Sequence, residues 1–353
     1  MLPLPRRPMT SDAQLERLSP DELGLPEGAR FPFRFSPGHS WSPLVVSFPH
    51  VGLAWPHDLR PKPQVDFARN ADYEIHTVYR GIPSLGAATV EAHFSRLVVD
   101  LNRADDDVAV QLVPDHPAPR PRMKPGVPGG AAPVGWDRPG RGVVWASAMT
   151  ASAGTTRILQ PPLAYEEFES RISRFHRPYY RALEVLLERR RQRFGYAVLL
   201  DAHSMPGSVG VDLVLGTLDG GSCADAVANT AMDALSGDGE RGTLLSVRRD
   251  DPYQGGEIVR RFGRPGEGIH ALQLEVSRRL YMDERVYRVL HWPNDLRPLE
   301  PDDPVRGGTA APDRRRSREL HELVTRVRAL VRALSGHSSS DASTEATARS
   351  AAP

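Results

Sequence analysis

Three short, mainly apolar runs that lead into polar residues constrain this fold more than any other feature of the sequence. They cover Leu44–Phe48, residues 94–100 and residues 196–201. Runs of this length bounded by turn-forming residues are typical of strands buried on both faces of a sheet. Helical segments separate them, and strands that alternate with helices indicate an α/β protein. We expect a three-layer α/β sandwich with a mostly parallel or mixed central sheet.

The remaining elements follow from residue spacing. Apolar residues recur at helical spacing between residues 165 and 193. Pro178 should kink or divide that helix because proline lacks the N–H that a helix interior needs. Further helices are expected over residues 65–80, 222–236 and 313–334, and further strands over residues 211–217, 243–248 and 270–275.

Composition shifts mark the expected domain boundaries. Residues 1–35 form an N-terminal arm, of which residues 1–30 are polar, rich in proline and expected to pack loosely. A single α/β domain should cover residues 36–334. Within it, residues 113–142 are so rich in Pro, Gly and Arg that they predict a long insertion. The Ser/Ala/Thr-rich tail, residues 335–353, is predicted to be disordered.

Composition also excludes several classes of protein. Lys and Arg number 45 and Asp and Glu 44, so the net charge of +1 gives no global field for nucleic acid or membrane. The single cysteine, Cys223, excludes a disulfide framework and a multi-thiolate zinc site. No apolar run is long enough for a transmembrane helix, and residues 1–22 lack the apolar core of a secretory signal. We therefore expect a cytoplasmic protein.

Polar residues with metal-binding side chains follow the predicted strands. His50, His203 and Glu275 each come directly after an apolar run. Because side chains at the carboxyl ends of strands converge on one crevice, these residues could hold a catalytic metal. Asp72 and His76 are four residues apart on the predicted helix 65–80 and share a face, so either could complete the site. A single such histidine could equally be a hydrogen-bonded strand end.

Candidate anion-binding residues are arginines near the same predicted strand ends. Asn102 and Arg103 follow the run at 94–100, and a guanidinium matches the geometry of a carboxylate. Arg260 or Arg261, after two glycines, could supply a second positive charge. The glycine pairs at 220–221 and 255–256 match no phosphate-binding spacing, so nucleotide binding is not supported.

Taken in order, several segments resemble the N-formylglutamate amidohydrolase family across residues 40–290. The match rests on the order of all the segments, because each single motif is unspecific. The matching segments are SFPHVG (47–52), DYEIHTVY (72–79), VVDLNR (98–103), RPYY (177–180), DAHS (201–204), DLVLGTLDGGSC (212–223), GGEIVR (255–260), LQLE (272–275) and LYMDE (280–284).

This resemblance implies a fold like that of the zinc carboxypeptidases and aspartoacylases, a phosphorylase/hydrolase-like sandwich with one zinc ion per chain. His50 and His203 look like the two histidine ligands. The third ligand should come from Asp72 or His76, where His76 replaces a residue that is usually acidic in the family. Glu275 looks like the general base that takes a proton from a metal-activated water.

The resemblance also implies roles in substrate binding. Asn102 and Arg103 look like the pair that holds the substrate carboxylate, and Tyr281 in the last matching segment should contact the substrate. Arg103 or Arg260 should stabilise the oxyanion of the transition state. The expected substrate is a small N-acyl amino acid such as N-formylglutamate.

Three alternatives remain open from the sequence. The chain could be a different zinc amidase or deacylase that acts on a peptide or a cell-wall fragment. It could be a binding protein of the same fold that has lost catalysis. It could also be an interaction module that works through residues 113–142 and the basic C-terminal helix.

Overall fold

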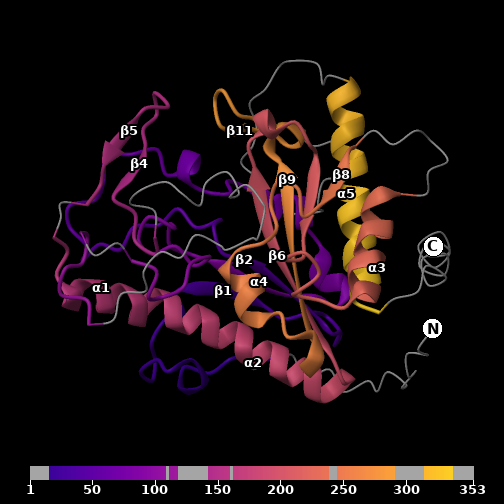
Figure 1. The fold of residues 1–353 in the computed structure, drawn as a ribbon, viewed down its shortest axis with the longest axis horizontal. Helices are drawn as coiled ribbons and strands as arrows, with labels where there is room; N and C mark the ends of the chain where they lie inside the picture. Colours follow the sequence, from indigo (N-terminus) through magenta and orange to yellow (C-terminus); the bar gives the residue numbers. More distant parts are fainter. Residues whose placement is uncertain are drawn as a thin grey trace, which may run out of the picture.

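The computed structural model describes residues 16–108, 111–117, 142–159, 162–237, 245–290 and 314–336. A seven-stranded sheet with the order β1-β3-β2-β6-β9-β7-β8 forms its centre (Figure 1). The strands are β1 Phe33–Ser36, β2 Leu44–Phe48, β3 Ala88–Ala92, β6 Ala197–Met205, β7 Leu213–Gly216, β8 Val247–Arg249 and β9 Ile269–Ser277. β3, β2, β6 and β9 run parallel, whereas β1 and β7 pair antiparallel to β3 and β9. The predicted α/β class with a mostly parallel or mixed sheet is confirmed.

Helices and two small hairpins surround this sheet. The longer helical segments are α1 Tyr165–Arg171, the π-helix η5 Ile172–His176, α2 Arg177–Phe194, α3 Asp225–Ser236, α4 Glu257–Phe262 and α5 Arg314–Leu334. Short 3-10 helices are η1 Asp21–Leu23, η2 Ala68–Asn70, η3 Ile75–Tyr79, η4 Ile82–Leu85, η6 Gly207–Val209, η7 Pro265–Glu267 and η8 Arg278–Leu280. The hairpins pair β4 Ser147–Met149 with β5 Thr155–Arg157, and β10 Met282–Asp283 with β11 Arg288–Val289. Among the described helices, none has the length and apolar character needed to cross a bilayer.

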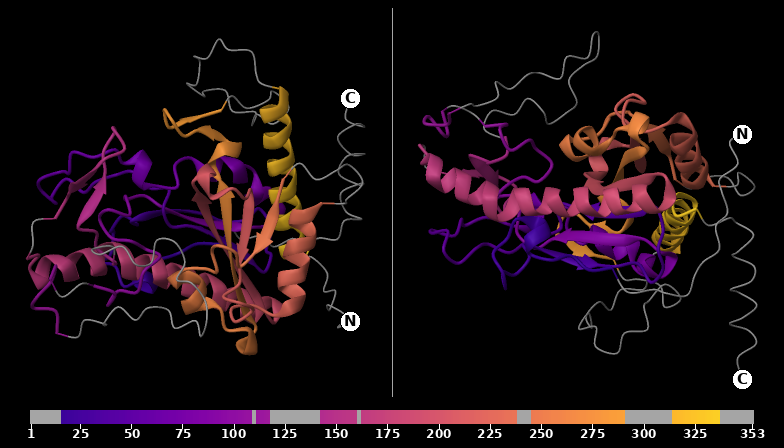
Figure 2. Two further views of the ribbon diagram at one scale, coloured as in Figure 1. Left: turned by 45° about the horizontal axis from the view of Figure 1, so that its top comes forward. Right: turned by 90° about the horizontal axis from the view of Figure 1, so that it is seen from below.

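Alternating side chains of the central strands build a core on each face of the sheet. In β2, Val45 packs toward α2, while Leu44, Val46 and Phe48 belong to the opposite core. The same alternation continues through β6 and β9, because successive side chains of a strand point to opposite faces. Helices α2 and α4 cover one face, and α3 and α5 lie side by side on the other (Figure 2). The protein is therefore layered as helix, sheet and helix.

Most of the predicted elements are present. Strands were expected at 211–217, 243–248 and 270–275 and occur as β7, β8 and β9, although residues 243–244 lie outside the described part. The helices predicted over 222–236 and 313–334 are present as α3, which begins at Asp225, and α5, which begins at Arg314. The long helix from residue 165 is divided by the π-helix η5 directly before Pro178, which occupies the first turn of α2.

The predicted helix over residues 65–80 is wrong. Two 3-10 helices, η2 and η3, replace it, and the turn between them contains Glu74 in the left-handed conformation at φ 59°. A left-handed residue cannot continue a right-handed helix. The regular spacing that would place Asp72 and His76 on one face is therefore lost.

The predicted strand over residues 94–100 is also wrong. Phe94 makes one isolated bridge to Ala54, and the chain then turns, with Val98 donating its N–H to the carbonyl of Ser95. Leu97 and Val98 are apolar because they fill cores beneath this turn. The strand that joins the sheet here is β3, which carries a short Ala-Thr-Val-Glu-Ala sequence.

The N-terminal segment packs more tightly than expected where it is described. Leu23 of η1 is buried against α2, and Glu16 forms a buried ion pair with Arg190 of α2. Residues 1–15, most of the insertion at 113–142 and most of the tail at 335–353 lie outside the described residues.

Candidate metal centre and active site

His50 reaches the site from the turn that follows β2. It lies two residues beyond Phe48, the last residue of the strand, and its side chain is buried. Its Nε2–H donates to Oδ1 of Asp100 at 2.7 Å. Asp100 in turn accepts hydrogen bonds from Arg96, from the indole of Trp145 and from the main-chain N–H of Asn102. The ring orientation of His50 is therefore fixed from its outer side.

Asp100 stays ionised in this environment. Burial would raise the pKa of its carboxyl group, but the charges of Arg96 and His50 and the hydrogen bond to His50 hold that pKa well below its usual range. Arg103, predicted to bind the substrate, adds to this lowering through its charge. Because an ionised carboxylate can only accept hydrogen bonds, Asp100 keeps a proton on Nε2 of His50.

His203 has the same arrangement on β6. Asp201 stands two residues earlier on the strand, so both side chains point to the same face. Nε2 of His203 donates to Oδ2 of Asp201 at 2.7 Å, and Nδ1 lies 2.9 Å from Oδ2 of Asp72. Burial would lower the pKa of His203, but the charges of Asp201 and Asp72 and their hydrogen bonds raise it well above its usual range. The site thus attracts positive charge.

Asp72 joins the two histidines from the turn before η3. Its main-chain N–H donates to the carbonyl of His50 at 2.9 Å, and its Oδ2 lies 3.4 Å from Nδ1 of His50. The ligand atoms of His50, Asp72 and His203 all lie within 4.8 Å of one another, and all three side chains are buried. The two imidazole rings are 4.9 Å apart.

These donors fit a divalent metal ion. Both histidines donate their Nε2–H outward to carboxylates, so both Nδ1 atoms face inward toward Asp72. Nδ1 of His50 is buried and has no hydrogen-bond partner among the described residues, although it faces the carboxylate of Asp72. The raised pKa of His203 indicates that this inner side stabilises a positive charge, which a proton on Nδ1 or a metal ion in its place can supply. Two imidazoles and a carboxylate are ligands that zinc accepts, as do other divalent metals.

The structure does not bring His76 into this group. Its Nε2 lies 3.7 Å from Oε2 of Glu74, and its side chain is 32% exposed. The left-handed turn at Glu74 separates His76 from Asp72. Of the two candidates for the third ligand, Asp72 is therefore the one that faces both histidines.

Glu275 lies beside the metal group on β9. It is the register partner of His203 in the neighbouring parallel strand, so the two side chains share a face of the sheet. Gln273, two residues earlier, donates its Nε2–H to Oε1 of Glu275 at 2.9 Å. Burial, together with the charges of Asp72 and Asp201, raises the pKa of Glu275 to about 7, although the charges of His203 and Arg278 oppose this rise. A carboxyl group with this pKa can both accept and deliver a proton near neutral pH.

Asn102 links α4 to β9 beside the histidines. Its Oδ1 accepts the main-chain N–H of Ile258 at 3.0 Å, and its Nδ2 lies 3.5 Å from Oε1 of Gln273. A Cβ atom on Gly256 would lie 2.1 Å from the Asn102 amide, so only glycine allows this approach. Asn102 is consequently held in place within the site wall.

The other predicted substrate residues lie in different surroundings. Arg260 on α4 is 43% exposed and pairs with Glu257 at 3.1 Å. Tyr281 is buried, and its hydroxyl donates to the carbonyl of Tyr73 at 3.1 Å. Burial raises the pKa of the Tyr281 hydroxyl, so it remains protonated.

Sequence reasoning missed several residues that contact the group. They are Asp100, Asp201, Ser204, Gln273 and Arg278. The spacing of two between Asp201 and His203, and between Gln273 and Glu275, could have revealed one neighbour of each residue. No local pattern marks Arg278.

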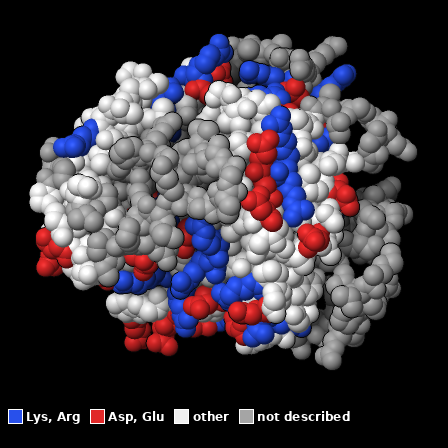
Figure 3. All heavy atoms as spheres, in the orientation of Figure 1, with Lys and Arg blue, Asp and Glu red and all other residues white. Residues whose placement is uncertain are grey.

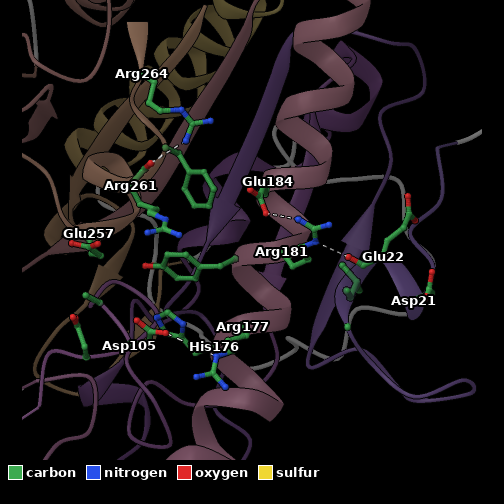
Figure 4. Close-up of a pocket in the computed structure, with 16 residues that line it drawn as sticks. Asp21, Glu22, Asp105, His176, Arg177, Arg181, Glu184, Glu257, Arg261 and Arg264 are labelled. Atoms are coloured by element: carbon green, nitrogen blue, oxygen red, sulfur yellow. Dashed lines mark hydrogen bonds and ion pairs between the residues drawn. The ribbon is translucent and has the colours of Figure 1, made fainter. Parts of the chain in front are cut away.

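A cavity of about 700 Å³ opens next to this site, between α2 and α4 (Figure 4). Ala104, His176 and Tyr180 line it, and Arg261 projects into it. His50, Asp72 and His203 are not among its lining residues. Basic and acidic side chains are interspersed around α2 and α4 on the face shown in Figure 3. The cavity therefore borders the loop that carries Asn102 without opening onto the metal group.

Comparisons with known proteins place this chain in a family. Residues 42–282 match the family model described as N-formylglutamate amidohydrolase. The chain is 32% identical over 255 residues to an N-formylglutamate deformylase of Pseudomonas putida, covering 69% of this chain and 82% of the relative. It is 31% identical to an N-formylglutamate deformylase of Pseudomonas aeruginosa, with coverage of 69% and 83%.

A solved structure also aligns with this fold. The crystal structure of N-formylglutamate amidohydrolase from Ralstonia eutropha superposes with a TM-score of 0.64 at 26% identity. It covers 86% of this chain and 98% of that structure. The family match and the two relatives identify this chain as a member of the N-formylglutamate amidohydrolase family, hydrolases that act on a non-peptide amide bond.

Proposed function

We propose that this chain hydrolyses N-formylglutamate, or a closely similar N-acyl amino acid, with one zinc ion held by His50, Asp72 and His203. The observation that carries the proposal is the pair of inward-facing Nδ1 atoms around the Asp72 carboxylate. The names of the two Pseudomonas relatives support the choice of substrate. The family resemblance further suggests a fold related to that of the zinc carboxypeptidases.

When bound, zinc would act as a Lewis acid that polarises the amide carbonyl and acidifies a water molecule. The protein itself holds the three ligand side chains in place. It also keeps other hydrogen-bond donors away from the side of these ligands that faces the metal. Asp100 and Asp201 accept the Nε2–H of the two histidines, so each Nδ1 would be the ligand atom once a metal replaces any proton there.

Glu275 is the proposed general base and acid. It accepts a proton from the attacking water as the C–O bond forms, and then delivers that proton to the amide nitrogen as the C–N bond breaks and the carbonyl is restored. Its pKa of about 7 suits both steps. Gln273 holds Oε1 of Glu275, which leaves Oε2 as the oxygen for proton transfer.

Arginine and amide groups are proposed to bind the substrate's carboxylates and the oxyanion. Arg103 follows Asn102 on the loop beside His203, and its positive charge helps to lower the pKa of Asp100. Arg103 is therefore better placed than the solvent-facing Arg260, which we retain as the second candidate. Tyr281 is buried against Tyr73 and is proposed to shape the substrate pocket through its neighbours.

Metal analysis of the purified full-length chain tests this proposal. We expect about one zinc per chain, lost in a His50→Ala/His203→Ala double variant. Replacement of the exposed His57 by alanine is the matched control and should leave the zinc in place. N-formylglutamate and other N-acyl amino acids are then assayed for release of the free amino acid.

Each outcome separates one alternative. A chain that binds no zinc even after zinc is supplied would refute the metal hydrolase. A chain that binds zinc but cleaves none of these substrates would instead support a deacylase for peptides or cell-wall fragments, or a binding protein.

A further inference from the structure

The second oxygen of Asp72 is held by Ser204 and Arg278. Oδ2 faces His50 and His203, whereas Oδ1 points the other way. Ser204 donates its hydroxyl to Oδ1 at 3.0 Å, and Nη2 of Arg278 lies 3.5 Å from the same oxygen. Nε of Arg278 also donates to the hydroxyl oxygen of Ser204 at 3.0 Å. The two side chains therefore act on Oδ1 as one linked unit.

Arg278 is itself fixed on its other sides. Nη1 donates to the hydroxyl of Tyr287 at 3.2 Å, and Nη2 donates to the carbonyl of Ala71 at 3.3 Å. The Tyr287 ring lies under the guanidinium of Arg69 at 4.5 Å, and Arg69 donates to the carbonyl of Arg285. Only 11% of the Arg278 side chain is exposed. The hairpin of β10 and β11 thereby holds the guanidinium against Asp72.

We propose that Arg278 is a positioning residue for Asp72, and that with Ser204 it occupies Oδ1 so that Oδ2 alone is presented to the metal. This inference rests on the proposed metal function of the group. The planar fork of a guanidinium can contact Ser204, Asp72 and Tyr287 at once, which a single ammonium group cannot do. Outer partners of metal ligands usually contribute about 10- to 100-fold to metal affinity.

Zinc affinity of the metal-stripped full-length chain tests the inference, measured by competition with a chromophoric chelator. Arg278→Met keeps the length of the side chain but removes every donor, and should raise the zinc Kd about 10- to 100-fold. Ser204→Ala removes one partner of Oδ1 and should raise it about tenfold. Arg278→Lys should restore part of the affinity because it keeps the charge.

Arg279 supplies a matched control on the same 3-10 helix. It pairs with Asp212 and Glu319, away from the metal group. Arg279→Met should lower the thermal midpoint of the chain and leave the zinc Kd unchanged.

The outcomes distinguish this inference from the proposed function. If the wild type binds no zinc, the metal function fails and the inference fails with it. If the wild type binds zinc and folded Arg278→Met binds it equally tightly, only the positioning role is refuted. If Arg278→Met does not fold, the zinc affinities of Ser204→Ala and Tyr287→Phe test the positioning role instead. Wild-type zinc affinity in both variants would overturn that role.

Discussion

Replacement of Asp100 by asparagine should change which nitrogen of His50 carries the proton. An amide has the shape of the carboxylate, but its NH2 group must take the place of one oxygen. At Oδ2 it would meet the donors of Arg96 and Trp145, and at Oδ1 it would meet those of His50 and Asn102. Three N–H groups point at Oδ2, two of them from Arg96, whereas two point at Oδ1, so fewer donors oppose the NH2 group at Oδ1. The amide should therefore turn its NH2 to His50, which must then accept at Nε2 and carry its proton on Nδ1.

The magnitude follows from the bonds that change. Two charge-assisted bonds to Oδ1 are lost, each worth about 1.5–3 kcal/mol, and one neutral bond worth about 1 kcal/mol replaces them. The free energy of unfolding of the metal-free chain should fall by about 2–5 kcal/mol. A proton on Nδ1 also blocks the metal-binding lone pair, so the zinc Kd should rise about 10- to 100-fold, equivalent to about 1.4–2.8 kcal/mol.

Asp201 offers the same substitution with a different expected result. Its Oδ2 accepts from His203, but its buried Oδ1 has no hydrogen-bond partner among the described residues. In Asp201→Asn the NH2 can take the Oδ1 position, where no donor opposes it, and the oxygen can still accept from Nε2. Its effect on the zinc Kd should therefore be at least about tenfold smaller than that of Asp100→Asn.

Three measurements on each variant test this reasoning. Urea unfolding gives the stability, chelator competition gives the zinc Kd, and ring-nitrogen NMR shifts report the tautomer of His50. Equal losses of zinc affinity in the two variants would refute the tautomer argument. So would an Asp100→Asn protein in which Nε2 of His50 remains protonated.

Three further outcomes are expected. Glu275→Gln should retain zinc by elemental analysis while turnover falls about 100- to 10,000-fold, and full activity would show that another group takes the proton. Glu16→Ala leaves the buried guanidinium of Arg190 without its 2.9 Å and 3.1 Å partners. It should lower the free energy of unfolding in urea by about 3–5 kcal/mol, and unchanged stability would contradict a paired buried charge. Burial raises the pKa of Cys223 to about 11, so at about pH 8 roughly one thiol in a thousand is ionised. A thiol reagent should label one group per chain only after unfolding, whereas fast labelling of the folded chain would disprove this.

The sequence determined the central strands and most of the polar residues at their ends. Leu44–Phe48 and the run before His203 are apolar because these strands are buried on both faces. Since parallel neighbours end at the same edge, His50, His203 and Glu275 could be expected to converge. The same reasoning failed at residues 94–100, because burial beneath a turn requires apolar residues as strictly as a strand does.

Only the tertiary structure decided between Asp72 and His76 and identified the residues around them. One left-handed residue, Glu74, broke the helical spacing on which the sequence prediction depended. Asp72 then meets Ser204 and Arg278, which lie more than 130 and 200 positions away along the chain. Contacts of this kind depend on how turns and strands pack against each other. No spacing within the sequence encodes them, because local periodicity describes only neighbours on the same element.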